Sequence, residues 1–300
     1  MERTILLTLE YDGSGFHGWQ QQSELRSVQG TVREALSAVL GRETQVNGTS
    51  RTDAGVHALG QCCSFVTESA IPAANLPLAL NNMLAGGRNA AGRRISDVRV
   101  LSAEEMQPGF HARFDCRGKT YRYVFSTGAP SVFRQKYCYF VDPKMCALPE
   151  GKLDLTAMDR AAALFTGTHD FAAFQSAGGT PRETTVRTVF GADVRQVGAP
   201  EPKGAGTGTA AGADVPAVPH AQPGDYVFTV TGDGFLYNMV RIMAGTLVEV
   251  GLGRRDPEEI PGILASADRR QAGHTAPPQG LYLAKIYFDA LQGQDGYGKD

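Results

Sequence analysis

Hydrophobic residues in the first hundred positions follow strand spacing and helix spacing in turn. Apolar side chains two positions apart predict strands, and those three, four and seven apart predict helices. The expected strands are 4–11, 61–66 and 95–101, and the expected helices are 28–40 and 76–84. Ser27 and Gly41 flank the first helix, and they are residue types favoured at helix N- and C-termini respectively. The order β-α-β-α-β predicts an α+β unit.

The second half of the chain repeats this alternation around a stretch of low complexity. The expected strands are 119–125, 185–195, 226–231 and 280–288, and the expected helices are 155–165, 239–250 and 258–267. Residues 197–224 contain 18 Ala, Pro or Gly among 28, which predicts a flexible insert. Residues 85–94 are rich in Gly and Arg and predict a flexible basic loop.

The length and the position of these elements predict two domains and a tail. We expect an N-terminal α+β domain over residues 1–106 and a C-terminal α+β domain over residues 107–290, followed by a tail over residues 291–300. The N-terminal domain would carry the segment over residues 50–61.

Composition excludes several classes of protein. The chain has no run of 18 apolar residues, so we expect no transmembrane helix, and its charged start does not match a signal peptide. Its five cysteines are odd in number and form no CxxC pair, which argues against a disulfide framework or a zinc site and favours a reducing cytoplasm. The net charge of −2 means that any nucleic-acid partner must be held by a local basic surface.

Residues 50–61 have neither strand nor helix periodicity and predict a loop that runs into the sheet. Arg51 and Asp53 form a compact pair of cation and carboxylate, and Gly55 gives the backbone freedom directly behind them. Two interpretations remain open at this stage. The loop is a surface turn with a solvated ion pair, or it holds a functional carboxylate on a rigid scaffold.

Cations and aromatic residues are interleaved between residues 109 and 125. The residues concerned are Arg113, Arg117, Lys119 and Arg122, with Phe110, Phe114, Tyr121 and Tyr123. Cations hold phosphates and aromatic rings stack on bases, so this mixture suits RNA, although an ordinary amphipathic strand explains it equally well. Tyr121 and Tyr123 share one strand face, so one can belong to the core and the other to a site.

Arg241 is the only charged residue between Asp233 and Glu249, in a helix that is apolar nearly all round. Such a helix is expected to be buried. A buried guanidinium needs a carboxylate or phosphate partner, because its desolvation alone costs several kcal/mol. The alternative is that the side chain extends to the surface.

Seven motifs in a fixed order resemble the tRNA pseudouridine synthase A (TruA) family, over residues 3–288. The motifs are residues 10–20, 51–58, 110–114, 121–123, 167–171, 238–245 and 280–283. The resemblance implies two RNA-recognition-like (ferredoxin-like) halves that form one mixed, mainly antiparallel sheet, with helices packed on one side and a central cleft. It also implies a homodimer that acts without a cofactor, and we expect neither a metal nor a membrane partner.

The activity implied by the resemblance is the isomerisation of uridine to pseudouridine at positions 38–40 of the tRNA anticodon stem-loop. By motif match, Asp53 is the nucleophile or base, and Arg241 pairs with it. Tyr121 packs on the base and takes part in proton transfer, and Arg51 acts in nucleotide flipping. The expected substrate-binding residues are Tyr121, Arg113, Arg117, Lys119 and His57. A non-catalytic RNA-binding protein or tRNA chaperone, and a carboxylate-based nucleosidase, remain as alternatives.

Overall fold

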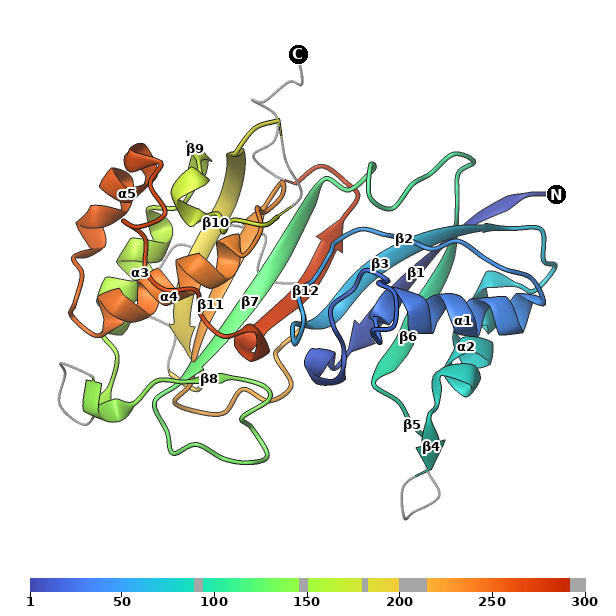
Figure 1. Cartoon of the computed structure of the whole chain (residues 1–300), viewed down its shortest axis with the longest axis horizontal. Coiled ribbons are helices and arrows are strands. Elements are labelled where there is room, and N and C mark those ends of the chain that lie inside the picture. The colour runs from blue at the N-terminus through green and yellow to red at the C-terminus, as the bar shows by residue number, and fades with distance from the viewer. Residues whose placement is uncertain (89–93, 146–150, 180–182, 200–214, 292–300) are drawn as a thin grey trace. The chain divides into compact units, whose positions relative to one another are not determined.

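The computed structural model describes residues 1–88, 94–145, 151–179, 183–199 and 215–291 (Figure 1). These residues form a mixed α+β protein with a large mixed sheet and five α-helices. The chain divides into two compact units. The first unit consists of Met1–Arg117 and Leu283–Asp289, and the second contains Gly118–Tyr282 with Ala290 and Leu291. The predicted domain boundary after residue 106 and the ferredoxin-like description of the halves stay predictions.

The sheet of the first unit is built around its first strand. Strand β1 (Arg3–Tyr11) lies between β3 (His57–Thr67) and β6 (Val98–Met106) and is antiparallel to both. Ile5, Leu7 and Leu9 share one face of β1 and are fully buried. The short β2 (Asn47–Gly48) pairs with β3. The final strand, β12 (Leu281–Tyr287), most of which belongs to this unit, is also a neighbour of β3 in the sheet.

The two helices of the first unit have the predicted positions. Helix α1 (Val28–Leu40) begins after Ser27, whose hydroxyl accepts a hydrogen bond from Gly30 N at 3.2 Å. It ends at Gly41, whose φ of 69° is left-handed and therefore suits glycine. Helix α2 (Leu76–Leu84) packs against α1, on the same side of the unit in Figure 1.

Two segments of the first unit differ from the predicted loops. Residues 57–61 are the start of β3, because Ala58 pairs with Tyr11 and this pairing outweighs weak strand propensity. Within residues 85–94, β4 (Gly87–Arg88) pairs with β5 (Arg94–Ile95) in an antiparallel ladder. The remaining part of that expected loop, residues 89–93, lies outside the described residues.

The second unit has its own group of strands, one of which is parallel to its neighbour. Strand β11 (Tyr226–Gly232) lies between β7 (Gly118–Ser126) and β10 (Val186–Gln196), antiparallel to both. Strand β9 (Gly167–Asp170) pairs with β10, and β8 (Tyr139–Phe140) runs parallel to β7. The helices of this unit are α3 (Leu155–Ala163), α4 (Met239–Gly251) and α5 (Ile260–Ser266). Helix α4 contacts α3 and β7 and is buried on nearly every side, as its sequence predicts.

The C-terminal part of the predicted flexible insert is packed into the second unit. Val215 and Val218 are buried, and Pro216 accepts a hydrogen bond through its carbonyl from the Arg122 guanidinium. The His220 ring stacks on Tyr137, with ring centroids 3.9 Å apart and planes at 17°. Apolar and aromatic side chains within this Ala- and Pro-rich segment thus find partners on the strands and loops, and the flexibility expected of the insert stays a prediction. Residues 200–214 lie outside the described part of the chain.

Helix length bears on membrane insertion. The longest helices, α1 and α4, have 13 residues each, whereas about 20 apolar residues span a bilayer. Over the ranges that the structure describes, no helix has the length and apolar character needed to cross a membrane.

Candidate functional site

The segment between β2 and β3 carries Arg51 and Asp53, and hydrogen bonds hold it on both sides. The buried Gln61 side chain donates to Ser50 O at 2.7 Å and accepts from Ser50 N at 3.3 Å. The carbonyl of Thr52 accepts from the main-chain N–H of Trp19 at 3.0 Å. These bonds fix the residues directly before and between the two charged side chains, so the loop is a rigid platform.

Two glycines allow the neighbouring segment to approach this loop closely. A Cβ atom at Gly13 would lie 1.9 Å from the Val56 carbonyl oxygen, which is far inside contact distance. A Cβ atom at Gly18 would lie 2.6 Å from Thr52 O, and its φ of +91° also favours glycine. The buried Trp19, which follows Gly18, packs at the core and is 2% exposed. Trp19 of the 10–20 motif therefore supports the loop from the core side.

Asp53 lies at the turn of this loop in a half-buried position, whereas Arg51 is exposed. The turn is closed by a hydrogen bond from Val56 N to Asp53 O at 3.2 Å, and Gly55 adopts a left-handed φ of 78°. The main chain that carries the Asp53 carboxylate is thus fixed in position. That arrangement suits general-base or nucleophilic chemistry, both of which depend on position.

His57 braces the loop from the interior, with 2% of its surface exposed. The N–H of Gly13 donates to His57 Nδ1 at 3.1 Å, and Asp12 Oδ1 lies 3.3 Å from the same nitrogen. The position of His57 favours a supporting role, and its predicted contact with substrate stays a prediction.

The predicted cations Arg113 and Arg117 lie on an exposed loop that is joined to the Asp53 segment. Ala112, which is fully buried, donates to Ser64 Oγ at 3.0 Å. Its carbonyl accepts from Thr49 Oγ1 at 3.2 Å. Thr49 lies two residues before Arg51, so both segments are fixed to the same part of β3. The first unit thus brings exposed cations and a half-buried carboxylate onto one anchored framework.

Strand β7 of the second unit carries Lys119, Tyr121 and Tyr123. Tyr123 is fully buried and donates its hydroxyl to Pro277 O at 2.6 Å, and burial raises its pKa well above 10. Tyr121 packs its ring edge-on against Phe235, with centroids 5.2 Å apart and planes at 87°. Tyr121 is buried as well, with 8% of its surface exposed, so both tyrosines belong to the core. The role predicted for Tyr121 stays a prediction.

The guanidinium of Arg241 is half-buried on α4 and is oriented by two oxygen atoms. Its Nε donates to Ala276 O at 2.8 Å, and its Nη1 donates to Asn238 Oδ1 at 2.7 Å. Asn238 is in turn held by Ser176, whose Oγ accepts from Asn238 Nδ2 at 3.1 Å. These bonds orient the planar group, and the choice between a buried ion pair and a side chain that extends to the surface stays a prediction.

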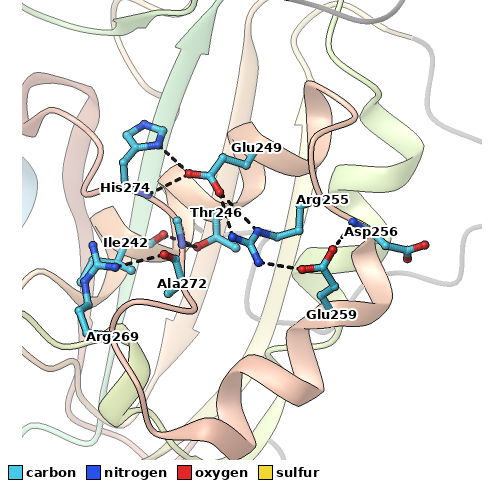
Figure 2. Close-up of polar contacts among 10 residues, drawn as sticks. Ile242, Thr246, Glu249, Arg255, Asp256, Glu259, Arg269, Ala272 and His274 are labelled. Carbon is cyan, nitrogen blue, oxygen red and sulfur yellow. Dashed lines mark hydrogen bonds and ion pairs between the residues drawn. The ribbon is translucent and has the colours of Figure 1, made fainter.

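Residues 272–277 form a segment, here called the strap, that lies along α4 and supplies the Ala276 carbonyl. Gly273 N donates to Thr246 Oγ1 at 2.9 Å, and His274 N donates to Glu249 Oε1 at 3.0 Å (Figure 2). A Cβ atom at Gly245 would lie 1.8 Å from His274 O, so glycine permits this close approach. Arg241, Gly245 and Glu249 are spaced four apart and share one helix face. The strap therefore links Glu249 to the position of Arg241.

Glu249 is the charged centre of the contacts in Figure 2. Hydrogen bonds from His274, and then from Arg255, lower its pKa from an ordinary 4.5 to about 2. Its folded-state pKa lies below the unfolded value, so the stabilisation is present above about pH 4.5 and is lost as the pH falls through 2.

Replacing Glu249 with Gln is expected to lower the free energy of unfolding at pH 7 by about 2 kcal/mol, after allowing for partial exposure. The variant should also lose stability less steeply than the natural chain between pH 4.5 and 2. Urea unfolding at a series of pH values measures both effects. Glu258→Gln serves as the control, because Glu258 forms an exposed ion pair with Arg160. Parallel pH profiles for Glu249→Gln and the natural chain would contradict this assignment.

Three supporting residues were not predicted from the sequence: Gln61, Asn238 and Glu249. Asn238 and Glu249 lie at positions i−3 and i+8 from Arg241, so helix spacing around the isolated cation contained a usable signal. Gln61 had no such signal, because its side chain bonds to Ser50, eleven residues away along the chain.

The predicted site residues are divided between the two units. Arg51, Asp53, His57, Arg113 and Arg117 belong to the first, and Lys119, Tyr121 and Arg241 belong to the second. The pairing of Asp53 with Arg241 stays a prediction. Within the described part of the chain, no three or more His, Cys, Asp or Glu residues form a group that could hold a metal ion.

Comparison with known proteins gives matches over almost the whole chain. Residues 8–115 and 161–289 match the model of a family described as tRNA pseudouridine synthase. The chain is 40% identical over 289 residues to tRNA pseudouridine synthase A of Ruminiclostridium cellulolyticum, a match that covers 95% of this chain and 100% of that protein. It is 38% identical over 287 residues to tRNA pseudouridine synthase A of Acetivibrio thermocellus, with the same coverage.

Proposed function

Because this chain belongs to the tRNA pseudouridine synthase A family, we propose that it forms pseudouridine at positions 38–40 of the tRNA anticodon stem-loop. The reaction class, isomerisation of uridine in tRNA, follows from family membership. The position within the tRNA and the residue roles are our proposal. The observation that supports it most is the anchored loop carrying Asp53, which lies within the matched range.

The reaction rearranges one glycosidic bond and leaves the atomic composition unchanged. The bond between C1′ of the ribose and N1 of uracil breaks, the base rotates, and a new bond forms between C1′ and C5. The proton on C5 is then lost, and N1 ends with a proton. No electron acceptor is required, so the residues must supply charge stabilisation, base positioning and proton transfer.

Asp53 is the group that we propose acts at the ribose. Its carboxylate can attack C1′ or remove a ribose proton, and both actions need the ionised form. An arginine beside a carboxylate favours that form, and we assign this role to Arg241. The orientation of Arg241 by Asn238 and the strap supports the assignment, because a fixed guanidinium loses little freedom when it pairs.

Arg51, Tyr121 and the cations Arg113, Arg117 and Lys119 are proposed to handle the nucleotide. A uridine in a stem-loop must leave its stack before a carboxylate reaches its sugar. Arg51 is exposed two residues from Asp53 and is placed to fill the vacated position. Tyr121 offers an aromatic face to the base and a hydroxyl to its edge, and the three cations bind phosphates. We also propose that the protein acts as a homodimer, as the resemblance implies, and in the cytoplasm, as its cysteine content favours.

The direct test is to incubate the purified protein with an unmodified tRNA transcript and to map pseudouridine by chemical labelling and primer extension. We expect the modification at one or more of positions 38–40, with no added metal or cofactor. Binding of tRNA without pseudouridine would support the chaperone alternative, and release of free uracil would support a nucleosidase. Modification only outside the anticodon stem-loop would overturn the positional proposal.

A further inference from the structure

The two phenylalanines of the 110–114 motif have opposite environments. Phe110 is half-buried, and its ring packs on Phe288 with centroids 5.2 Å apart and planes at 66°. Phe114 is turned outward, with 73% of its surface exposed. Burial explains the presence of an aromatic residue at position 110. It does not explain one at position 114, because a large apolar side chain in water contributes nothing to the core.

The exposed ring is held by a rigid backbone. Phe114 N and Asp115 N both donate to His111 O at 3.0 Å, which closes a tight turn. The Asp115 side chain accepts from His111 N at 2.7 Å, and Ala112 is anchored to β3. A ring presented on such a fixed turn loses little conformational freedom when another molecule stacks on it.

Polar and cationic groups flank the ring. The His111 ring lies 4.3 Å from the Phe114 ring, centroid to centroid, at an angle of 31°. The Arg113 guanidinium lies 6.0 Å from the Phe114 centroid, and Arg113 is exposed. An exposed aromatic face beside a cation matches what an unpaired nucleotide requires, which is stacking for the base and a positive charge for its phosphate.

A second copy of the chain fits this surface less well. A two-fold contact centred on Phe114 would bring Arg113 of both copies together, and like charges would oppose it. A nucleotide brings a phosphate of opposite charge instead. The anticodon stem-loop of the proposed substrate also offers unpaired bases.

We propose that Phe114 is a stacking platform for an unpaired base of the tRNA, next to a phosphate held by Arg113. The inference rests on the proposed function only in taking tRNA as the ligand. It adds a binding subsite on the 109–117 loop, outside the loop that carries Asp53.

Fluorescence provides a direct test, because the chain has one tryptophan, the buried Trp19. Phe114→Trp adds an exposed indole whose emission should be quenched when an anticodon stem-loop RNA is added. Phe133→Trp is the matched control. Phe133 is 84% exposed and, like Phe114, lies next to an arginine in the sequence, but that arginine, Arg134, forms an ion pair with Asp225. Quenching in both variants alike, or in neither, would overturn the proposal.

Affinity for the same RNA separates stacking from charge. Phe114→Ala and Phe114→Leu should both bind roughly 10-fold more weakly, because leucine keeps apolar volume but has no aromatic face. Phe114→Trp and Phe133→Ala should bind as the natural chain does. Arg113→Ala should reduce the slope of log affinity against log salt by about 1, and Phe114→Ala should leave that slope unchanged.

Two further measurements keep the outcomes distinct. Thermal melting should be unchanged in the Phe114 variants, since the side chain is exposed. If Phe114→Ala retains RNA affinity and changes the sedimentation coefficient, the ring contacts another copy and the proposal is wrong. Pseudouridine mapping with the natural chain is run in parallel. If that mapping detected no pseudouridine, the proposed function would be overturned. The quenching and affinity measurements test independently whether Phe114 stacks on a base.

Discussion

Asp53→Asn is expected to reduce pseudouridine formation by about 10²–10⁴-fold or more, while tRNA affinity stays within a few-fold of the natural value. The amide has nearly the shape of the carboxylate but neither accepts a proton nor attacks C1′ at a useful rate. Because the loop is held through Ser50, Thr52 and Val56, the substitution leaves its backbone bonds in place. Single-turnover assays with excess enzyme measure the chemical step without interference from product release.

Asp12→Asn provides the matched control for this experiment. Asp12 is a carboxylate of the same unit whose side chain accepts from Ser14 N at 2.9 Å, and we assign it no part in the reaction. It should retain nearly full activity. If the Asp53→Asn protein modified tRNA at the natural rate, Asp53 would not be the catalytic residue. The interpretation of the loop as a surface turn with a solvated ion pair would then be open again.

Arg241→Ala is expected to lower the rate of the chemical step by about 10²–10³-fold, with a much smaller loss of tRNA affinity. The proposed reason is that Asp53 loses the cation that keeps it ionised and oriented. The substitution also leaves the buried carbonyl of Ala276 without the Nε donor, which costs about 1–3 kcal/mol of stability. Assays therefore belong well below the melting temperature, which circular dichroism measures for each variant.

Two further variants separate charge from orientation at this position. Arg241→Lys keeps the charge but loses the planar set of donors, so it should recover only part of the rate. Asn238→Ala keeps Arg241 and removes the oxygen that lies 2.7 Å from its Nη1, so it should lower the rate by a smaller factor. If Arg241→Ala weakened tRNA binding and left the single-turnover rate unchanged, Arg241 would be a phosphate ligand.

The helices and most strands could be predicted from the sequence because their signals are local. Helix α1 has a Ser cap, an apolar stripe and a terminal Gly, and all three lie within residues 27–41. The start of β3 could not be predicted this way, because His57 to Gln61 are strand residues through pairing with β1, about fifty residues earlier. The packing of residues 215–224 could not be predicted for a similar reason, since their partners Arg122 and Tyr137 lie far away along the chain.

At the candidate site, too, some residues have a local sequence signal and others depend on distant parts of the chain. Asp53 and Arg241 were conspicuous because each is a charge in an unusual local setting. The side chain of Gln61 bonds to the main chain of Ser50, and the strap bonds to Arg241 through the main-chain carbonyl of Ala276, and no spacing rule describes such contacts. A buried His57 was expected at the substrate, and only the Gly13 hydrogen bond indicates that it braces a turn.

The first unit is completed by the last strand of the chain, and this has a consequence for synthesis on the ribosome. Residues 1–117 emerge first, but Leu283–Asp289 of the same unit emerge more than 160 residues later. Until then β3 lacks the neighbour whose main chain lies against Gly60, and Arg117 N lacks its acceptor, Tyr287 O. The nascent N-terminal part therefore carries an open strand edge, a known starting point for aggregation. A fragment ending at Arg117 should self-associate, and an added peptide spanning residues 281–289 should suppress that association.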